Sequence, residues 1–167
     1  MPSRRRQPIT LETIADDPHV QAWAELAFAY HRITRRMEQA LVTDGLTLSQ
    51  FEVLIRLKMD GAMSQSALAA KLLVTKGNIS GLLNRMVKAR LVQRKSDRSD
   101  RRAHQIVMTP HGHQVFEQSF PKHIRLIHEI LSPIKSTEVK SLHSMMMQLQ
   151  AGDNETPPCP TMRQKIK

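Results

Sequence analysis

The chain has 167 residues, of which 40% are hydrophobic, and its formal net charge is +10 at pH 7. This length suits one domain with a hydrophobic core and is short for two. No apolar run is long enough to span a membrane, and the N-terminal MPSRRRQPIT lacks the apolar segment of a secretory signal. The single cysteine, Cys159, excludes an intramolecular disulfide. We therefore expect a soluble, cytoplasmic protein.

The positive charge is concentrated in the middle of the chain. Residues 46–112 carry twelve Lys and Arg against four Asp and Glu. Residues 1–45 balance at six against six, and residues 113–167 carry seven against five. A basic segment of this kind favours an acidic polymer as partner, most simply nucleic acid. On charge alone, a solvated basic surface without a partner is the alternative.

The first part of the chain predicts an arm and two helices. Residues 1–18 are expected to form a flexible, arginine-rich arm. From His19 to about Thr43, apolar residues recur at the spacing of one helix face, and Asp44-Gly45 ends this pattern. A second helix of roughly eleven residues is expected within TLSQFEVLIRLKMDG, where Ser49 and Glu52 have the spacing of a capping box.

Two further helices, separated by a tight turn, are predicted after Gly61. Ser64 suits the N-cap of the first, SALAAKLL, and the second runs from about Lys76 to Ala89 after a turn at Val74-Thr75. The apolar residues of the second helix fall on one face, and they are Ile79, Leu82, Leu83 and Met86. Its opposite face is polar and basic. This arrangement is typical of a helix-turn-helix.

A hairpin and two helices are expected in the rest of the chain. VQRKS (92–96) and AHQIVMT (103–109) tolerate β structure and flank DRSDRR, which predicts a two-stranded hairpin, the wing of a winged helix. Thr109 and Pro110 then suit the N-cap and first position of a helix. Pro121 should kink or break that helix. A last helix, STEVKSLHSMMMQL, ends near Gly152.

This order of elements resembles the MarR family of bacterial transcriptional regulators. The resemblance covers about residues 19–150 and is carried by LTLSQFEVL, SALAAKLLVTKGNISGLLNRMVKARLVQR and DRSDRRAHQIVMTPHG. It implies a mostly α fold with a small β-hairpin wing, a winged helix-turn-helix inside a helical homodimer. It also implies that the second helix of the helix-turn-helix enters the major groove of DNA, while the wing reaches the adjacent minor groove.

The resemblance divides the chain into five parts. In chain order these are a flexible N-terminal arm (1–18), a dimerisation helix (19–45), a winged helix-turn-helix DNA-binding lobe (46–112), C-terminal dimerisation helices (113–151) and a flexible tail (152–167).

The candidate DNA-binding residues lie on two helices. Asn78 has an amide that can pair with adenine, whereas Lys76 and Arg85 suit phosphates. Gly77 and Gly81 each cost about 1 kcal/mol relative to alanine inside a helix. Either the helix backbone approaches DNA closely there, or Gly77, near the helix end, is simply tolerated. Gly81 stands where the family often has a long basic residue. The recognition-helix candidates are Thr75, Lys76, Gly77, Asn78, Ser80, Gly81, Asn84 and Arg85, and Ser64, Gln65 and Ser66 are candidate phosphate ligands on the preceding helix.

The loop of the hairpin combines arginines with aspartates. Arginine suits phosphate oxygens and narrow minor grooves, so Arg98, Arg101 and Arg102 are predicted to bind DNA. Phosphate repels an aspartate, so Asp97 and Asp100 are predicted to brace the loop instead. A solvated charged turn is the alternative for DRSDRR taken alone.

Members of the family commonly respond to small, often phenolic or anionic, molecules bound between the dimer helices and the DNA-binding lobe. On the first helix, Trp23, Tyr30, His31 and Arg35 form a set able to stack on and hydrogen-bond an aromatic acid. Taken singly, each is more often a core, dimer or surface residue.

Oxidation and zinc are weaker switching hypotheses. Peroxide-sensing relatives have a cysteine near the start of the first helix, whereas Cys159 lies in the tail. Among eight histidines, neighbouring pairs have poor chelating spacing. A site assembled from His31 and His104 is the remaining possibility for zinc.

The leading hypothesis is a sequence-specific DNA-binding regulator. The expected form is a homodimeric repressor, released from a pseudo-palindromic operator by a small aromatic or phenolic ligand and nucleoid-associated when bound to DNA. The alternatives are a metal-responsive regulator and a basic protein that coats nucleic acid without sequence choice. The 4% aromatic content disfavours the latter. The sequence shows no acid/base pair, activated nucleophile or phosphate loop, so it predicts no enzyme, catalytic residue, metal site or cofactor.

Overall fold

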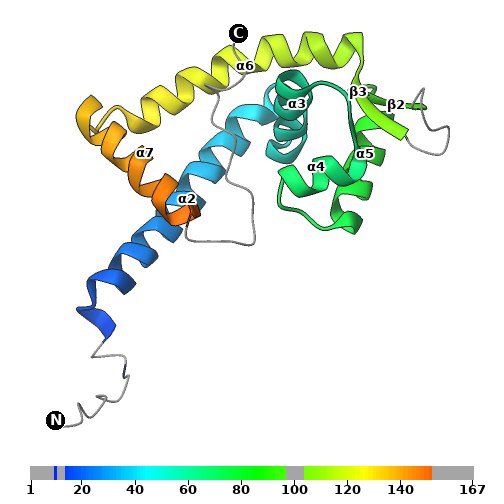
Figure 1. Ribbon diagram of the computed structural model, residues 1–167. Helices are drawn as coiled ribbons and strands as arrows, with labels where there is room; N and C mark the ends of the chain where they lie inside the picture. The colour runs from blue at the N-terminus through cyan, green and yellow to red at the C-terminus, as the bar shows by residue number, and fades with distance from the viewer. Residues whose placement is uncertain (1–9, 11–13, 97–103, 152–167) are drawn as a thin grey trace, which may run out of the picture.

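The computed structural model describes residues 10, 14–96 and 104–151. It is mostly helical with a small antiparallel sheet, which confirms the expected winged-helix fold class (Figure 1). The elements in chain order are α2 (Pro18–Val42), α3 (Leu48–Asp60), β1 (Met63–Ser64), α4 (Gln65–Lys71), α5 (Lys76–Lys88), β2 (Val92–Ser96), β3 (His104–Met108), α6 (Pro110–Leu131) and α7 (Ser136–Ala151).

The helix-turn-helix and the sheet form one lobe, from which two long helices extend. In Figure 1, α3, α4, α5 and the strands cluster on the right, and α2 runs away from them toward the N-terminus. Helix α6 leaves the sheet, passes α3 and contacts α2. The lobe and the long helices are therefore joined through α3 and α6.

A third strand completes the predicted hairpin. The strand order is β1-β3-β2, with Val92 opposite Met108 in the β2–β3 pair and Met63 opposite Ile106 in the β1–β3 pair. The two-residue β1 carries no alternation pattern of its own, so the sequence did not reveal it. Helices α3, α4 and α6 contact β3, and α5 contacts β2.

The core of the lobe gathers apolar side chains from every element around it. The four residues predicted for the buried face of α5 are all buried, with Ile79, Leu83 and Met86 fully so. Burying each such side chain contributes roughly 1.5–3 kcal/mol, and together they fix the rotation of α5 about its axis. Phe51 of α3 is fully buried and stacks on Phe116 of α6 at 6.0 Å between ring centroids.

Helix α3 begins earlier than predicted, so the capping box assigned to Ser49 and Glu52 is wrong. Thr47 has an extended backbone and is the N-cap; its Oγ1 accepts from the Gln50 N–H at 3.3 Å. The Gln50 side chain in turn accepts from the Thr47 N–H at 2.9 Å. Thr47 and Gln50 have the same spacing as Ser49 and Glu52, two residues closer to the N-terminus. The helix therefore has 13 residues.

Helix α6 is capped as predicted but is not broken. Thr109 Oγ1 accepts from the Gly112 N–H at 2.9 Å, and Pro110 occupies the first turn. Pro121 lies inside the helix, which continues to Leu131, so of the two effects predicted for it, a kink or a break, the break is wrong. Pro121 is exposed, and water can satisfy the carbonyl group that its missing N–H leaves unpaired.

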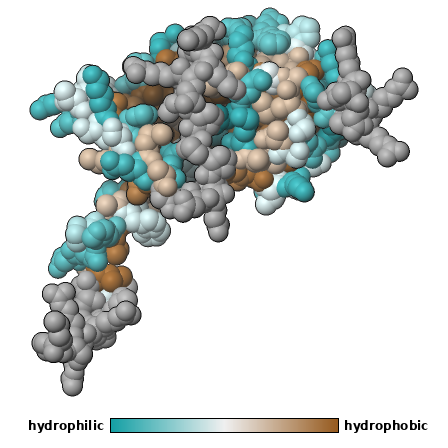
Figure 2. Space-filling model, viewed as in Figure 1, coloured by the Kyte–Doolittle hydropathy of each residue, from teal (hydrophilic) through white to brown (hydrophobic). Residues whose placement is uncertain are grey.

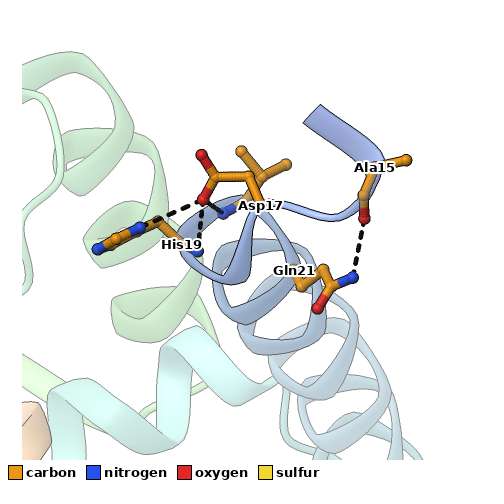
Figure 3. Close-up of polar contacts among 5 residues, drawn as sticks. Ala15, Asp17, His19 and Gln21 are labelled. Carbon is orange, nitrogen blue, oxygen red and sulfur yellow. Dashed lines mark hydrogen bonds and ion pairs between the residues drawn. The ribbon is translucent and has the colours of Figure 1, made fainter. Parts of the chain in front are cut away.

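The start of α2 is tied to the residues before it (Figure 3). One carboxylate oxygen of Asp17 accepts from the backbone N–H of His19 at 2.8 Å and of Val20 at 3.4 Å. The bond from His19 holds the pKa of Asp17 below its usual value. Gln21 Nε2 donates to the carbonyl of Ala15 at 2.8 Å. Most of the predicted arm and the whole predicted tail lie outside the described residues.

Candidate nucleic-acid interface

Helix α5 presents a polar face with an unusual centre. Because the apolar face is buried, helical spacing places Gly77 and Gly81 along the middle of the exposed face. Asn78 and Arg85 flank the glycines on one side and Asn84 on the other. A Cβ at Gly77 would meet nothing within 4 Å, so the packing of the chain itself does not require a glycine there.

The first turn of α5 is open to solvent. Thr75 is the N-cap, and its Oγ1 accepts from the Asn78 N–H at 3.3 Å. Thr75, Lys76, Gly77 and Asn78 are all exposed. Helix geometry leaves the first backbone N–H groups without an intrahelical partner, and the helix dipole favours negative charge at this end. This turn can therefore accept a phosphate group.

Arg85 lies back along the helix toward Gly81. A Cβ built at Gly81 would be 3.5 Å from Nη1 of Arg85. The guanidinium group thus occupies space that a longer side chain at Gly81 would contest. Ser80, the remaining predicted residue of α5, is half-buried at the edge of this face.

The three candidates at the start of α4 have different surroundings. Ser64 is the predicted N-cap, and its Oγ accepts from the Ala67 N–H at 3.2 Å and lies 2.9 Å from Oγ of Ser66. Ser64 and Gln65 are half-buried, whereas Ser66 is exposed. Of the three side chains, Ser66 is therefore the most accessible to a phosphate group.

Helix α4 is held against α3 by an ion pair. Lys71 Nζ lies 2.9 Å from a carboxylate oxygen of Asp60, whose side chain is only 5% exposed. This pair helps to fix the helix that precedes α5.

Arg94 of β2 is absent from the residues predicted above, yet it contacts α5 directly. Its Nη2 donates to Oδ1 of Asn84 at 2.9 Å. The sequence does contain a signal: in VQRKS the buried Val92 must face the core, and Arg94, two positions later, starts on the same face. The sheet therefore supplies a cation to the exposed face of α5.

The predicted wing residues follow β2 in the sequence. Asp97, Arg98, Asp100, Arg101 and Arg102 lie outside the described residues. Their anchors are described, because β2 and β3 pair along five positions, from Val92 opposite Met108 to Ser96 opposite His104. The stem of the predicted wing is thus a regular hairpin beside α5.

The candidate effector residues are all exposed on α2. Trp23 is 69% and Tyr30 64% exposed, and His31 and Arg35 are also exposed. The rings of Tyr30 and His31 meet edge to face, with centroids 5.8 Å apart. Within one chain, Trp23 and Tyr30 thus do not belong to the core.

Exposed apolar residues continue along α2 and recur on α7. Figure 2 shows hydrophobic surface on the part of α2 that extends from the lobe. The large apolar residues exposed on these two helices are Val20, Trp23, Leu26, Phe28, Tyr30, Val42, Leu142, Met145 and Leu149. Large exposed apolar patches are typical of interaction sites, so these two helices are candidates for one.

Polar groups gather where α2, α3 and α6 meet, and the sequence did not single them out. Lys122 forms an ion pair with Asp44 and holds the pKa of that carboxyl below its usual value. The ring of His123 lies 4.7 Å from that of Phe51, and burial lowers the pKa of His123. Lys58 of α3 also pairs with Glu117 of α6 at 2.6 Å. These contacts bind α6 to the lobe.

Two classes of feature are absent from the described part of the chain. Residues 10, 14–96 and 104–151 contain no group of three or more His, Cys, Asp or Glu arranged to hold a metal, and His31 and His104 are not brought into one. In the same residues, no helix combines the length and apolar character needed to cross a bilayer.

Known proteins resemble this chain in sequence and in fold. A family model described as MarR family matches residues 44–103. The chain is 27% identical over 121 residues to the HTH-type transcriptional regulator MhqR of Bacillus subtilis, covering 72% of this chain and 83% of that protein.

Two solved structures have the same fold. AbsC, a MarR family transcriptional regulator from Streptomyces coelicolor, superimposes with a TM-score of 0.76 at 24% identity, over 86% of this chain and 95% of that one. The organohalide-sensing regulator RdhR-CbdbA1625, bound to 2,4-dichlorophenol, gives 0.77 at 19% identity, over 91% and 89%. The family model, the sequence relative and these two folds together make the chain similar to the MarR family of winged helix-turn-helix transcriptional regulators.

Proposed function

We propose that this DNA-binding regulator is a homodimeric repressor that a small aromatic or phenolic ligand releases from a pseudo-palindromic operator. One observation carries the proposal. Helix α5 is fixed in rotation by a fully buried apolar face, so that its polar and basic face is turned outward beside the stem of the hairpin. This is the arrangement that a recognition helix in the major groove requires.

The residues divide between positioning and reading. In the first turn of α5, Thr75 and Lys76 hold a phosphate at the helix N-terminus, and Asn78 reads a base edge. Arg85 contacts phosphate, and Gly77 and Gly81 let the backbone approach the DNA. Further phosphate contacts come from Ser64, Gln65 and Ser66. In the wing, Arg98, Arg101 and Arg102 enter the minor groove, braced by Asp97 and Asp100.

A second copy of the chain covers exposed apolar residues of α2 and α7. Phe28, Val42 and Leu149 are each more than 60% exposed in one chain, and burying such side chains contributes much of the free energy of association. Residues 19–45 and 113–151 then form the dimer interface and 46–112 the DNA-binding lobe. In such a dimer the two α5 helices stand about 34–36 Å apart, one turn of DNA.

The ligand binds where the dimer helices meet the lobe. Trp23, Tyr30, His31 and Arg35 provide two aromatic faces, an imidazole and a guanidinium, a set suited to a phenol or an aromatic acid. The solved regulator with 2,4-dichlorophenol bound supports the choice of a phenolic class.

Binding to the DNA upstream of the protein's own gene tests this function. The purified protein is titrated in moderate salt against that DNA and against random competitor DNA. We expect a complex that resists the competitor and dissociates when a chlorophenol is added. Binding that random DNA abolishes equally would favour nonspecific coating of nucleic acid, and loss of binding with a chelator would favour a metal-responsive regulator.

A further inference from the structure

Arg94 and Asn84 form a hydrogen-bonded pair between the sheet and the exposed face of α5. Arg94 stands opposite the buried Ile106 in the β2–β3 register, so its side chain starts on the inner face of the hairpin. From there it reaches Asn84, and Nη2 donates to Oδ1 at 2.9 Å. Both residues are exposed. The pair therefore lies at the surface that the proposed function assigns to DNA.

The chemistry of arginine fixes the orientation of the asparagine amide. A guanidinium group has five N–H donors and no acceptor. The amide atom that faces Arg94 must therefore be the oxygen, and the amide nitrogen of Asn84 must point away. Arg94 takes one of the two lone pairs of the amide oxygen and covers that side of the amide, so the groups that the pair turns outward are mainly donors: the two N–H of Asn84 and the remaining N–H of Arg94. An amide oxygen does not neutralise the guanidinium charge, so Arg94 also retains its attraction for DNA.

A pair that presents mainly donors distinguishes the bases in the major groove. Guanine presents two acceptors there, O6 and N7, whereas adenine presents one acceptor and one donor. An unconstrained asparagine pairs bidentately with adenine, and that pairing needs its amide oxygen. Here Arg94 occupies the oxygen side of the amide. The constraint thus removes the usual preference of asparagine for adenine.

We propose that Arg94 is a specificity-determining residue that converts Asn84 from an adenine-reading into a guanine-reading side chain. This inference rests on the proposed function, because it assumes that α5 lies in the major groove of an operator. It assigns the sheet a part in base recognition separate from that of the wing loop.

The test is selection of preferred sites from a randomised duplex library with the full-length protein and its variants. The wild type should prefer guanine at one position of each half-site by about five- to hundredfold. Asn84→Ala should flatten that position only. Arg94→Ala should shift the same position from guanine toward adenine, weaken binding to all sequences, and lower the salt-dependence slope by about 1. Adding Asn84→Ala to Arg94→Ala should then change affinity by a different factor than it does in the wild type.

Two further variants separate charge from orientation. Arg94→Lys keeps the positive charge but not the splayed donors, so it should retain more affinity than Arg94→Ala while still losing guanine preference. Lys95→Ala removes a cation from the next position of the same strand, whose side chain starts on the opposite face. It should leave the base preference unchanged. Thermal unfolding of each variant confirms that it is folded.

Four outcomes decide the matter. An unchanged guanine preference in Arg94→Ala overturns the inference and leaves the proposed function intact. The same holds if Asn84→Ala and Arg94→Ala alter different positions, or if the wild type prefers adenine where Asn84 reads. A wild-type selection with no preferred sequence overturns the proposed function and this inference with it.

Discussion

The guanidinium group of Arg85 lies over Gly81, one turn earlier on the exposed face of α5, and a Cβ at Gly81 would be 3.5 Å from its Nη1. That distance is ordinary van der Waals contact, and Gly77 has still more room. Neither glycine is thus required by the packing of the free chain, although each lowers helix propensity. In the proposed DNA complex, close approach of the helix backbone to DNA would give both glycines a role.

Alanine at Gly77 should separate stability from binding. Gly77→Ala is expected to raise the free energy of unfolding by about 0.5–1 kcal/mol, because alanine is the better helix former and its Cβ meets no neighbour. Operator affinity should fall, because the methyl group prevents close approach of the backbone to DNA. Urea unfolding and operator titration measure the two effects. A stabilised variant that binds with unchanged affinity would show that Gly77 is merely tolerated.

Gly112 provides the opposite case. A Cβ there would lie 2.0 Å from the carbonyl oxygen of Leu91 and 3.1 Å from Cγ of Met108. Gly112→Ala must therefore displace backbone at the start of α6, and we expect destabilisation of about 2–3 kcal/mol or more. Thermal unfolding is the measurement, with Gly77→Ala as the matched control. An unchanged melting temperature contradicts the close packing of α6 against the Leu91 carbonyl.

Asn78 and Arg85 should differ in what their loss does to recognition. Asn78→Ala is expected to cost about 1–3 kcal/mol on the operator and to relax preference at one base pair. Arg85→Ala should weaken binding to all sequences by a similar factor, because a phosphate contact carries no sequence information. Parallel titrations of operator and random DNA distinguish these results. Equal losses on both DNAs for Asn78→Ala refute its role as a base reader.

The Asp44–Lys122 pair should stabilise the fold only where the carboxyl is ionised. Lys122 holds the pKa of Asp44 below 3.8 in the folded chain. The contribution of this ion pair to the free energy of unfolding is therefore complete above pH 3.8. It is lost as the pH falls toward the pKa of Asp44 in the folded chain. Asp44→Asn should remove the acid sensitivity that comes from this pair. The accompanying loss of stability at neutral pH should be less than about 1 kcal/mol, because Lys122 is half exposed and solvent screens the pair. Urea unfolding of the wild type and of Asp44→Asn at pH 6 and pH 3 tests this prediction. If both proteins lose the same stability between the two pH values, the pair does not stabilise the fold.

His123 should destabilise the fold in mild acid. Burial holds its pKa below 6.5 in the folded chain, so the unfolded chain binds the proton more readily. Protonation of His123 therefore does not reduce the free energy of unfolding above pH 6.5. As the pH falls from there toward the pKa of His123 in the folded chain, the free energy of unfolding declines. His123→Phe should flatten the stability profile between pH 7 and pH 5. His113→Gln, an exposed histidine on the same helix, should leave the profile as in the wild type.

Long periodic patterns in the sequence predicted most of the fold, and short or competing signals explain the errors. The apolar repeat of α5 and the β-tolerant residues on either side of DRSDRR predicted elements within one or two residues of their observed bounds. The strand β1 has only two residues, so its identity depends on pairing with β3. At α3, Thr47 and Ser49 offered the same capping spacing, and the sequence alone did not rank them.

The candidate site was predictable only where one element carries it. Once the apolar face of α5 is identified in the sequence, helical spacing identifies the opposite face as the exposed one. The Arg94–Asn84 pair instead depends on how β2 packs against α5. The Asp44–Lys122 pair likewise joins residues 78 positions apart. Local periodicity does not encode such tertiary contacts.

The unbroken course of α6 has a mechanical consequence. Its N-cap residue Thr109 follows β3, and the Thr109 hydroxyl donates to the carbonyl of Arg90, between α5 and β2. The 22 residues of the helix span about 33 Å to Leu131. A rod of this length magnifies rotation: a tilt of about 5° at its far end displaces the hairpin end by about 3 Å. Because α6 continues through Pro121 to Leu131, one helix connects the hairpin with the segment that leads into α7.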